Sequence, residues 1–278
     1  MELTQLKQLW QAHDFRPKKR MGQNFLIDKN VRDKIIGALC LTKESTVIEV
    51  GPGFGVMSLE LADKCEKLFA VEKDKRICEI MAPIFESRKN ITFFCDDILN
   101  VDFSAVTHNC ENLIIFGNIP YYISTPLMVK VIEARKYVKS VFIVIQDDLA
   151  RRITANPGSK TYGSISCFIQ FYTSCKRLFT ITNNCFYPRP QVESCLLKLE
   201  ILPHGSVEVQ DEELLFKIIR KAFSQRRKKV INSLSDKDFL SLNKAKWEDI
   251  LKKCKINPST RAENLSLQDY ATLTNCYL

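Results

Sequence analysis

Short apolar runs rich in β-branched residues alternate, along the first half of the chain, with segments in which apolar residues recur every three or four positions. The runs predict buried strands, and the recurring pattern predicts helices. The predicted strands cover residues 47–50, 68–71, 91–94, 113–116 and 141–145. The predicted helices cover residues 31–39, with Asp28 as cap, and 56–62, 77–85 and 125–134. This alternation predicts an α/β fold with a mostly parallel sheet and helices on both faces.

The pattern changes after Gln146. We expect a helix at 147–153, a turn at 156–159, two strands at 166–172 and 195–202 that pair antiparallel at the sheet edge, and a linker at 202–206. Beyond the linker the apolar spacing is helical, over 214–223, 228–234, 247–254 and 267–273. We therefore predict two domains: residues 1–202, a sheet domain that begins with a polar arm over residues 1–20, and residues 203–278, a small all-helical domain.

Composition indicates an ordinary globular protein, because 45% of the 278 residues are hydrophobic. No apolar run approaches the roughly 20 residues that cross a bilayer, and residues 1–5 lack a signal-peptide pattern, so we expect a cytoplasmic protein without a membrane partner. The eleven cysteines form no C-x-x-C pair, and the three histidines have no metal-ligand spacing. We expect reduced, mostly buried thiols and no metal site.

The net charge of +9 is concentrated in two basic clusters, residues 16–20 and 226–229, with further lysines between 244 and 255. A single basic run is ordinarily a solvated face. Two clusters far apart in the chain favour a polyanionic partner such as nucleic acid.

Polar or glycine-rich motifs follow three successive predicted strands. Gly51-Pro52-Gly53-Phe54-Gly55 follows the first, and its glycines allow a tight turn and close approach of a ligand. Glu72 ends the second strand, about 20 residues past the glycines, where it could bind a ribose diol. Asp96, Asp97 and Ile98 end the third, where a carboxylate and a backbone N–H could bind an adenine. Each acid alone is ordinarily solvated, but three such features together predict a nucleoside site.

The predicted cleft contains acids, Glu49, Glu72, Asp96 and Asp97, and its glycine loop contains no Lys or Arg. A dinucleotide would require a cationic or amide-rich pyrophosphate site. The charge therefore favours a cationic nucleoside, S-adenosylmethionine, over NAD.

Asn118-Ile119-Pro120-Tyr121 follows a further predicted strand. The Asn118 amide oxygen and the carbonyl before Pro120 are two adjacent acceptors, and Tyr121 adds an aromatic ring. This set suits the exocyclic amine and the face of a planar base. The alternative is that Asn-x-Pro only turns the chain.

The chain resembles the rRNA adenine N6-dimethyltransferases over nearly its whole length. The resemblance rests on Gln23-Asn24-Phe25-Leu26, Glu49-Val50-Gly51-Pro52-Gly53, Glu72, Asp97-Ile98-Leu99, Asn118-Ile119-Pro120-Tyr121, Pro157-Gly158-Ser159-Lys160, Tyr162-Gly163 and the Phe186 to Ser194 motif. In the C-terminal part, residues 222–228 and 261–266 look like the KsgA branch, which modifies small-subunit rRNA.

The resemblance implies a Rossmann-like class I methyltransferase sheet with a helical rRNA-binding C-terminal domain. It implies transfer of four methyl groups to two adjacent adenosines in the 3′-terminal hairpin of small-subunit (16S) rRNA. The partner would be an immature 30S-type subunit, and we expect a monomer. The cofactor would be bound by Asn24, Leu26, Gly51, Gly53, Glu72, Asp97, Ile98 and Asn118. The target adenine would be held by Asn118, Pro120, Tyr121 and Phe186.

Phe186 has an alternative role as a core residue, because Phe-x-Pro-x-Pro forms a stiff hydrophobic loop. Tyr122, Asp96 and Asp147-Asp148 depart from the usual family residues. Two other functions remain open. One is the macrolide-resistance branch, which dimethylates one large-subunit adenosine, and the other is an rRNA-binding assembly or transcription factor that has lost methyl transfer.

Overall fold

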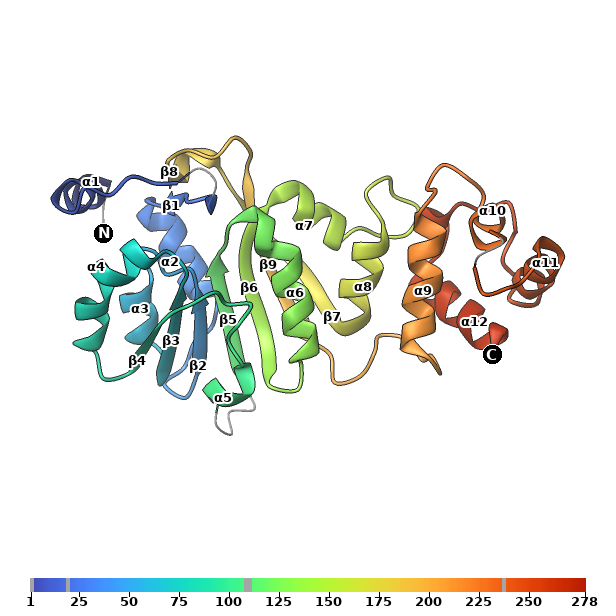
Figure 1. Ribbon diagram of the computed structural model, residues 1–278, viewed down its shortest axis with the longest axis horizontal. Coiled ribbons are helices and arrows are strands. Elements are labelled where there is room, and N and C mark those ends of the chain that lie inside the picture. The colour runs from blue at the N-terminus through green and yellow to red at the C-terminus, as the bar shows by residue number, and fades with distance from the viewer. Residues whose placement is uncertain (1–2, 19–20, 108–111, 237–238) are drawn as a thin grey trace. The chain divides into compact units, whose positions relative to one another are not determined.

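The computed structural model describes residues 3–18, 21–107, 112–236 and 239–278, without the side chains of residues 107 and 121. The chain forms two compact units (Figure 1). Met1–Ala150 and Lys176–Ile201 form the first, which we call the sheet unit. Arg151–Cys175 and Leu202–Leu278 form the second, which we call the helical unit. The chain therefore passes between the units more than once.

Within the described residues, seven strands form the large sheet, in the order β4-β3-β2-β5-β6-β9-β7. Their bounds are β2 Thr46–Val50, β3 Lys67–Glu72, β4 Ile91–Cys95, β5 Leu113–Asn118, β6 Val138–Gln146, β7 Thr173–Ile181 and β9 Ser194–Ile201. The first five strands of this order pair in parallel, and β9 pairs antiparallel with β6. The predicted mostly parallel α/β sheet with an antiparallel edge is confirmed. Because β2 to β5 are parallel, their carboxyl ends share one edge of the sheet.

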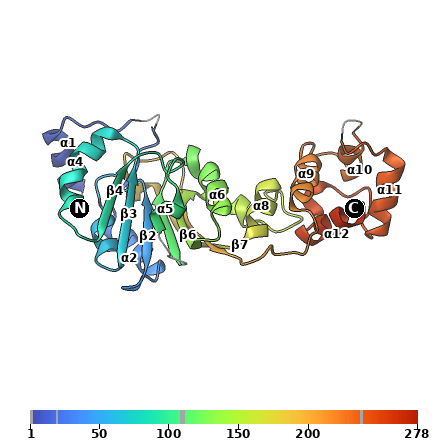
Figure 2. The ribbon, with the colours of Figure 1, turned by 60° about the horizontal axis from the view of Figure 1, so that its bottom comes forward.

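Helices and short strands complete the sheet unit (Figures 1 and 2). They are α1 Leu3–Ala12, β1 Phe25–Leu26, α2 Lys29–Ala38, α3 Ser58–Ala62, α4 Lys75–Glu86, α5 Phe103–Thr107, η2 Tyr121–Ile123, α6 Ser124–Glu133, η3 Asn183–Cys185 and β8 Phe186–Tyr187. The Asp28 side chain caps α2 by accepting from the Val31 N–H at 2.9 Å, as predicted. All five residues of β2 are buried, which explains why its apolar residues do not alternate with polar ones.

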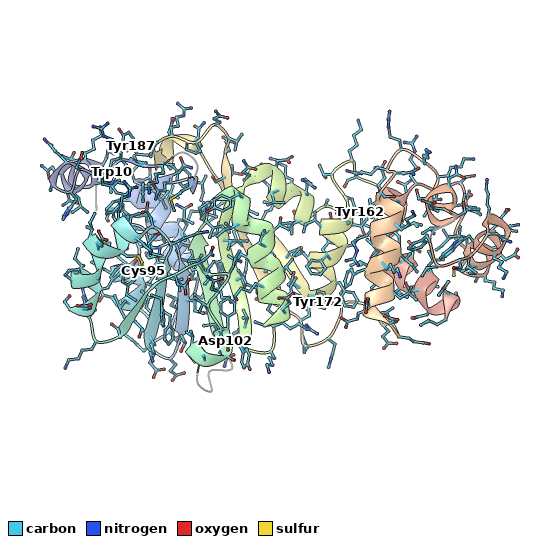
Figure 3. All side chains as sticks on the ribbon, viewed as in Figure 1. Trp10, Cys95, Asp102, Tyr162, Tyr172 and Tyr187 are labelled. Atoms are coloured by element: carbon cyan, nitrogen blue, oxygen red, sulfur yellow. A yellow bond between two sulfur atoms is a disulfide. The ribbon has the colours of Figure 1, made fainter. Side chains whose placement is uncertain are left out.

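The prediction of a polar arm over residues 1–20 was wrong, as the described residues of this segment show. Residues 3–12 form helix α1, whose Leu6 and Trp10 are buried. These residues lie four positions apart and therefore share one helix face. Trp10 stacks on Tyr187 at 5.5 Å between ring centroids (Figure 3). Phe15 meets Phe54 edge-on at 4.9 Å between ring centroids. The helix thus packs beside the loop that follows β2.

The predicted strand at 166–172 was also wrong. These residues belong to helix α8, Ser164–Tyr172, and the strand beside β9 is the next segment, β7. The run Ser-Cys-Phe-Ile-Gln-Phe-Tyr is short and largely apolar, and such a run has no periodicity that separates a buried helix from a strand. Buried positions on α8 include Cys167, Ile169 and Phe171.

The expectation of reduced thiols needs one correction, since Cys78 on α4 and Cys95 at the end of β4 form a disulfide. Their Cα atoms are 5.8 Å apart, within the ordinary span of a disulfide. The sequence offered no sign of this pair, because the two residues are 17 positions apart and meet only through the pairing of α4 with β4. The other described cysteines form no disulfide.

The helical unit is built on α8 together with α9 Glu212–Phe223, α10 Val230–Leu234, α11 Lys244–Lys253, η4 Ala262–Asn264 and α12 Leu267–Tyr277. α7, Asp147–Ile153, begins in the sheet unit and ends in this one. The rings of Phe171 and Tyr172 on α8 contact the ring of Phe216 on α9, with centroid distances of 5.3 and 5.7 Å. These ring contacts explain why residues 151–175 belong to the helical unit, whereas the prediction assigned them to the sheet domain.

Candidate functional site

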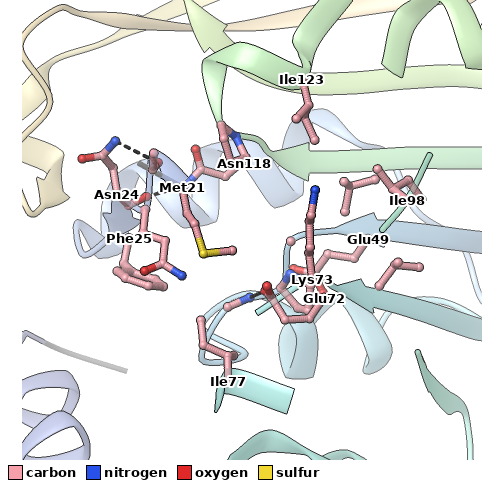
Figure 4. A pocket seen from close by; sticks show the side chains of 18 of the residues that line it. Met21, Asn24, Phe25, Glu49, Glu72, Lys73, Ile77, Ile98, Asn118 and Ile123 are labelled. Carbon is pink, nitrogen blue, oxygen red and sulfur yellow. Dashed lines mark hydrogen bonds between the residues drawn. The ribbon is translucent and has the colours of Figure 1, made fainter. Parts of the chain in front are cut away.

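The carboxyl ends of β2, β3, β4 and β5 border a cleft, drawn in Figure 4. Among the lining residues are Asn24, Leu26, Glu49, Gly51, Gly53, Glu72, Lys73, Asp96, Asp97, Ile98, Asn118, Pro120 and Tyr122. The structure thus brings together residues that are almost 100 positions apart in the chain.

The glycine loop after β2 takes a conformation that larger residues rarely adopt. Gly51 and Gly53 have φ angles of +68° and +56°. A Cβ at Gly53 would also lie 2.9 Å from the Phe25 ring. The loop backbone therefore lies close under β1 and forms one wall of the cleft.

The carboxylate of Glu72, at the end of β3, is buried and held by backbone amides. Its Oε2 accepts from the Gly53 N–H at 3.1 Å, and its Oε1 accepts from the Asp74 N–H at 2.8 Å. Burial raises the pKa of Glu72, and these hydrogen bonds oppose that rise. The two bonds fix the carboxylate against the glycine loop, where the sequence predicted a ribose-binding acid.

Glu49, on β2, also lies in the cleft and is only 3% exposed. Burial raises the pKa of its carboxyl to about 7; the nearby Ser58 hydroxyl lowers the value, and the negative charge of Glu72 raises it. Glu49 can therefore gain or lose a proton near neutral pH.

Asp97, after β4, makes two contacts through its carboxylate. Oδ1 accepts from the Leu99 N–H at 3.0 Å, and Oδ2 accepts from the Lys73 ammonium at 2.6 Å. Burial would raise the pKa of Asp97, but these two contacts bring it below its ordinary value. Ile98 is buried beside it, whereas Asp96 is exposed and accepts from the Asp97 N–H.

Lys73 was missed in the prediction, although it directly follows Glu72 at the end of β3. It is the only Lys or Arg among the described residues that line the cleft, against four acids. Even with Lys73, the lining keeps an excess of negative charge that favours a cationic ligand.

Asn118 ends β5, and its side chain has a defined orientation. Its Nδ2 donates to the backbone oxygen of Asn24 at 3.0 Å, while the Asn24 amide donates to the Gly22 carbonyl at 3.1 Å. In the described part of the chain no donor meets Asn118 Oδ1, so that oxygen remains available as an acceptor. Pro120 also lines the cleft.

The two predicted aromatic contacts differ from the other site residues. Tyr121 lies in η2, and its side chain is outside the described part of the chain. Phe186 is 3% exposed, lies in β8 opposite Leu26, and belongs to the hydrophobic core instead of the described lining of the cleft. Its burial favours the core role, and its contact with a base stays a prediction. Tyr122, by contrast, is 54% exposed at the cleft.

The basic clusters are described in part. Arg227 and Lys228 are exposed in the helical unit. Arg226 instead donates to the Tyr162 carbonyl at 2.6 Å and pairs with Glu263 at 3.3 Å. Arg226 therefore has a structural role within its unit. Lys19 and Arg20, in the first cluster, lie outside the described residues.

The sequence pattern of the ribosomal RNA adenine dimethylase family matches residues 14–278. The chain belongs to this family. The family membership expected from the motifs of the sequence is confirmed. A protein of Clostridium botulinum named ribosomal RNA small subunit methyltransferase A is 34% identical, with 97% of each chain covered. A protein of the same name from Macrococcus caseolyticus is 36% identical, with 98% of this chain and 94% of the relative covered.

Solved structures share the family's fold. A dimethyladenosine transferase from Plasmodium falciparum aligns with a TM-score of 0.76 at 21% identity, over 90% of this chain and 95% of its own. The 23S rRNA methyltransferase ErmE aligns with a TM-score of 0.71 at 20% identity, over 91% and 98%. Both have the Rossmann-like architecture expected here. No described helix is long and apolar enough to span a bilayer.

Proposed function

We propose that this enzyme transfers methyl groups from S-adenosylmethionine to N6 of two adjacent adenosines in the 3′-terminal hairpin of small-subunit (16S) rRNA, and so takes part in small-subunit maturation. The orientation of Asn118 carries the proposal, since its amide is anchored through Nδ2 and its Oδ1 remains an acceptor at the cleft. The names of the full-length relatives support the small subunit over the large-subunit alternative.

The cleft residues fit S-adenosylmethionine. The Glu72 carboxylate, already fixed by two backbone amides, would bind the ribose hydroxyls. Asp97 and the Ile98 N–H would bind the adenine, and the glycine loop would lie against the nucleoside. Asn24, Leu26 and Asn118 would complete the site. When bound, the cofactor supplies an electrophilic sulfonium methyl group.

The chain's part in the reaction is to prepare the target amine. The lone pair of an adenine N6 is delocalised into the ring, which makes it a poor nucleophile. Asn118 Oδ1 and the Ile119 carbonyl would accept its two hydrogens out of the ring plane, so that the nitrogen becomes pyramidal and its lone pair is localised. Most of the acceleration then comes from alignment of this lone pair with the methyl group to be transferred, and no strong base is needed.

The flipped base needs a stacking partner, because unstacking a base costs a few kcal/mol. The ring of Tyr121 is our candidate, and Phe186 is a second candidate whose burial favours a structural role instead. After the first methylation a single N–H remains, so Asn118 and the Ile119 carbonyl must also admit a monomethylated amine.

We further infer that the enzyme acts as a monomer in the cytoplasm on immature small subunits. Exposed cations such as Arg227 and Lys228 would contact rRNA phosphates. The helical unit would thus contribute to substrate binding, in keeping with the predicted role of residues 203–278.

Asn118→Ala tests the proposal. We expect it to abolish methyl transfer while S-adenosylmethionine binding, measured by calorimetry, stays nearly intact. Asn30→Ala, at an exposed position on α2 outside the described lining of the cleft, is the control for loss of an amide. Equal loss of transfer and cofactor binding in Asn118→Ala would indicate a structural asparagine and contradict the mechanism.

The substrate needs a separate experiment. The protein is incubated with immature small subunits, or with large subunits, and labelled S-adenosylmethionine, and the methylated bases are mapped. Two adjacent dimethyladenosines near the 3′ end of the small-subunit rRNA are expected. Label at one large-subunit adenosine would support the macrolide-resistance alternative, and binding without label would support a non-catalytic assembly factor.

A further inference from the structure

Lys73 and Asp97 form an ion pair across the cleft, between the ends of β3 and β4. The Lys73 Nζ lies 2.6 Å from Asp97 Oδ2, and the Lys73 side chain points into the cleft (Figure 4). The side chain of Lys73 is 50% exposed and that of Asp97 is 21% exposed. The pair raises the pKa of Lys73, consistent with a charged ammonium at neutral pH.

The other oxygen of Asp97 is already engaged, because Oδ1 accepts the Leu99 N–H at 3.0 Å. Lys73 and Asp97 both line the cleft, so a base that reaches Asp97 through an exocyclic amine approaches the carboxylate beside the Lys73 ammonium. The amine and the ammonium then compete for the side of the carboxylate that faces the cleft. The ammonium can leave at little cost because half of its side chain already lies in water.

We propose that Lys73 is a specificity-determining residue that holds Asp97 when no amine is bound and is displaced by the exocyclic amine of the cofactor's adenine. The inference rests on the proposed use of S-adenosylmethionine. Lys73 therefore lowers the affinity for a base that carries the exocyclic amine. The affinity for a base without the amine is unchanged, so the difference between the two affinities becomes smaller. The methylene groups of Lys73 remain beside the base after the ammonium has moved.

Lys73→Met tests this competition, because methionine keeps an unbranched apolar side chain and removes the charge. The ligand is S-adenosylhomocysteine, whose neutral sulfur avoids a direct charge effect at the sulfonium. An exposed ion pair of this kind predicts about two- to fivefold tighter binding to Lys73→Met than to the wild type, measured by calorimetry at low salt. Added salt screens the pair, so it should bring the wild-type affinity toward that of the variant.

A second ligand isolates the amine. An S-adenosylhomocysteine analogue with hydrogen in place of the 6-amino group cannot displace Lys73, so we expect its affinity to be equal for the wild type and Lys73→Met. Lys75→Met, at an exposed position outside the described lining of the cleft, is the control for loss of a positive charge and should bind both ligands as the wild type does.

The outcomes separate this inference from the proposed function. If the wild type does not bind S-adenosylhomocysteine, the proposed cofactor is wrong and the inference fails with it. If the wild type binds but Lys73→Met binds no tighter, or gains equally with the analogue that lacks the amine, only the inference on Lys73 is overturned.

Discussion

Replacing Glu49 by glutamine should stabilise the sheet unit above neutral pH. The Glu49 carboxyl is 3% exposed, and its pKa is raised from 4.5 to about 7, chiefly by burial. The unfolded chain loses this proton near its ordinary pKa, whereas the folded chain keeps it up to about pH 7. The folded state binds more protons in that interval, so stability falls as pH rises from about 4.5 through about 7 and then levels off.

The size of the effect follows from the shift. Each unit of pKa corresponds to about 1.4 kcal/mol, so ionised Glu49 costs the folded state about 3 kcal/mol above pH 8. Glutamine has nearly the same shape and does not titrate. Its stability advantage over glutamate should therefore grow by about 2–3 kcal/mol between pH 5 and pH 8.

Urea unfolding at constant ionic strength measures this difference. Trp10, which is buried in the sheet unit, can report unfolding by fluorescence in a Trp247→Phe background. Glu44→Gln, at an exposed position before β2, is the control and should show no such growth with pH. The test compares the free energies of unfolding of Glu49→Gln and the wild type. If Glu49→Gln is no more stable than the wild type, or if the difference is the same at pH 5 and pH 8, the buried carboxyl does not stay protonated to about pH 7.

Three further predictions concern other parts of the chain. Phe186→Ala should lower the free energy of unfolding by about 3–5 kcal/mol; unchanged turnover at a permissive temperature would assign Phe186 to the core alone. Reduction of Cys78–Cys95 should cost about 3 kcal/mol of stability in urea titrations, and a variant with serine at both positions should not respond to reductant. Arg227→Gln should weaken RNA binding and make its salt slope shallower by about one unit, whereas Arg226→Gln should chiefly lower the melting temperature; the opposite assignment would contradict the contacts of Arg226.

The sequence identified the cleft because its residues follow strands that are themselves recognisable. Gly51, Glu72 and Asn118 lie at the ends of buried runs, and Asp97 follows a largely apolar strand. Parallel pairing brings such positions to one edge of a sheet. The outline of the site therefore needed no long-range information. The sequence could not reveal the amide contacts of Glu72, since a carboxylate at a strand end carries no sign of its hydrogen-bond partners.

The errors have a common physical origin in tertiary contacts. α8 was predicted as a strand because a short apolar run lacks a distinguishing period, and its packing on α9 decides the outcome. α1 was predicted as a polar arm because its apolar face is small, yet Trp10 packs on rings from distant segments. Lys73 was passed over because only the fold brings it opposite Asp97.

The interleaving of the two units along the chain affects how the protein can be dissected. Ending the chain at residue 201 would remove α9 but retain residues 151–175, which belong to the helical unit. Phe171 and Tyr172 would then lose the ring of Phe216 and present an uncovered aromatic surface to water. A minimal catalytic fragment would need a second excision, with a designed connector in place of residues 151–175, to avoid that aggregation-prone remnant.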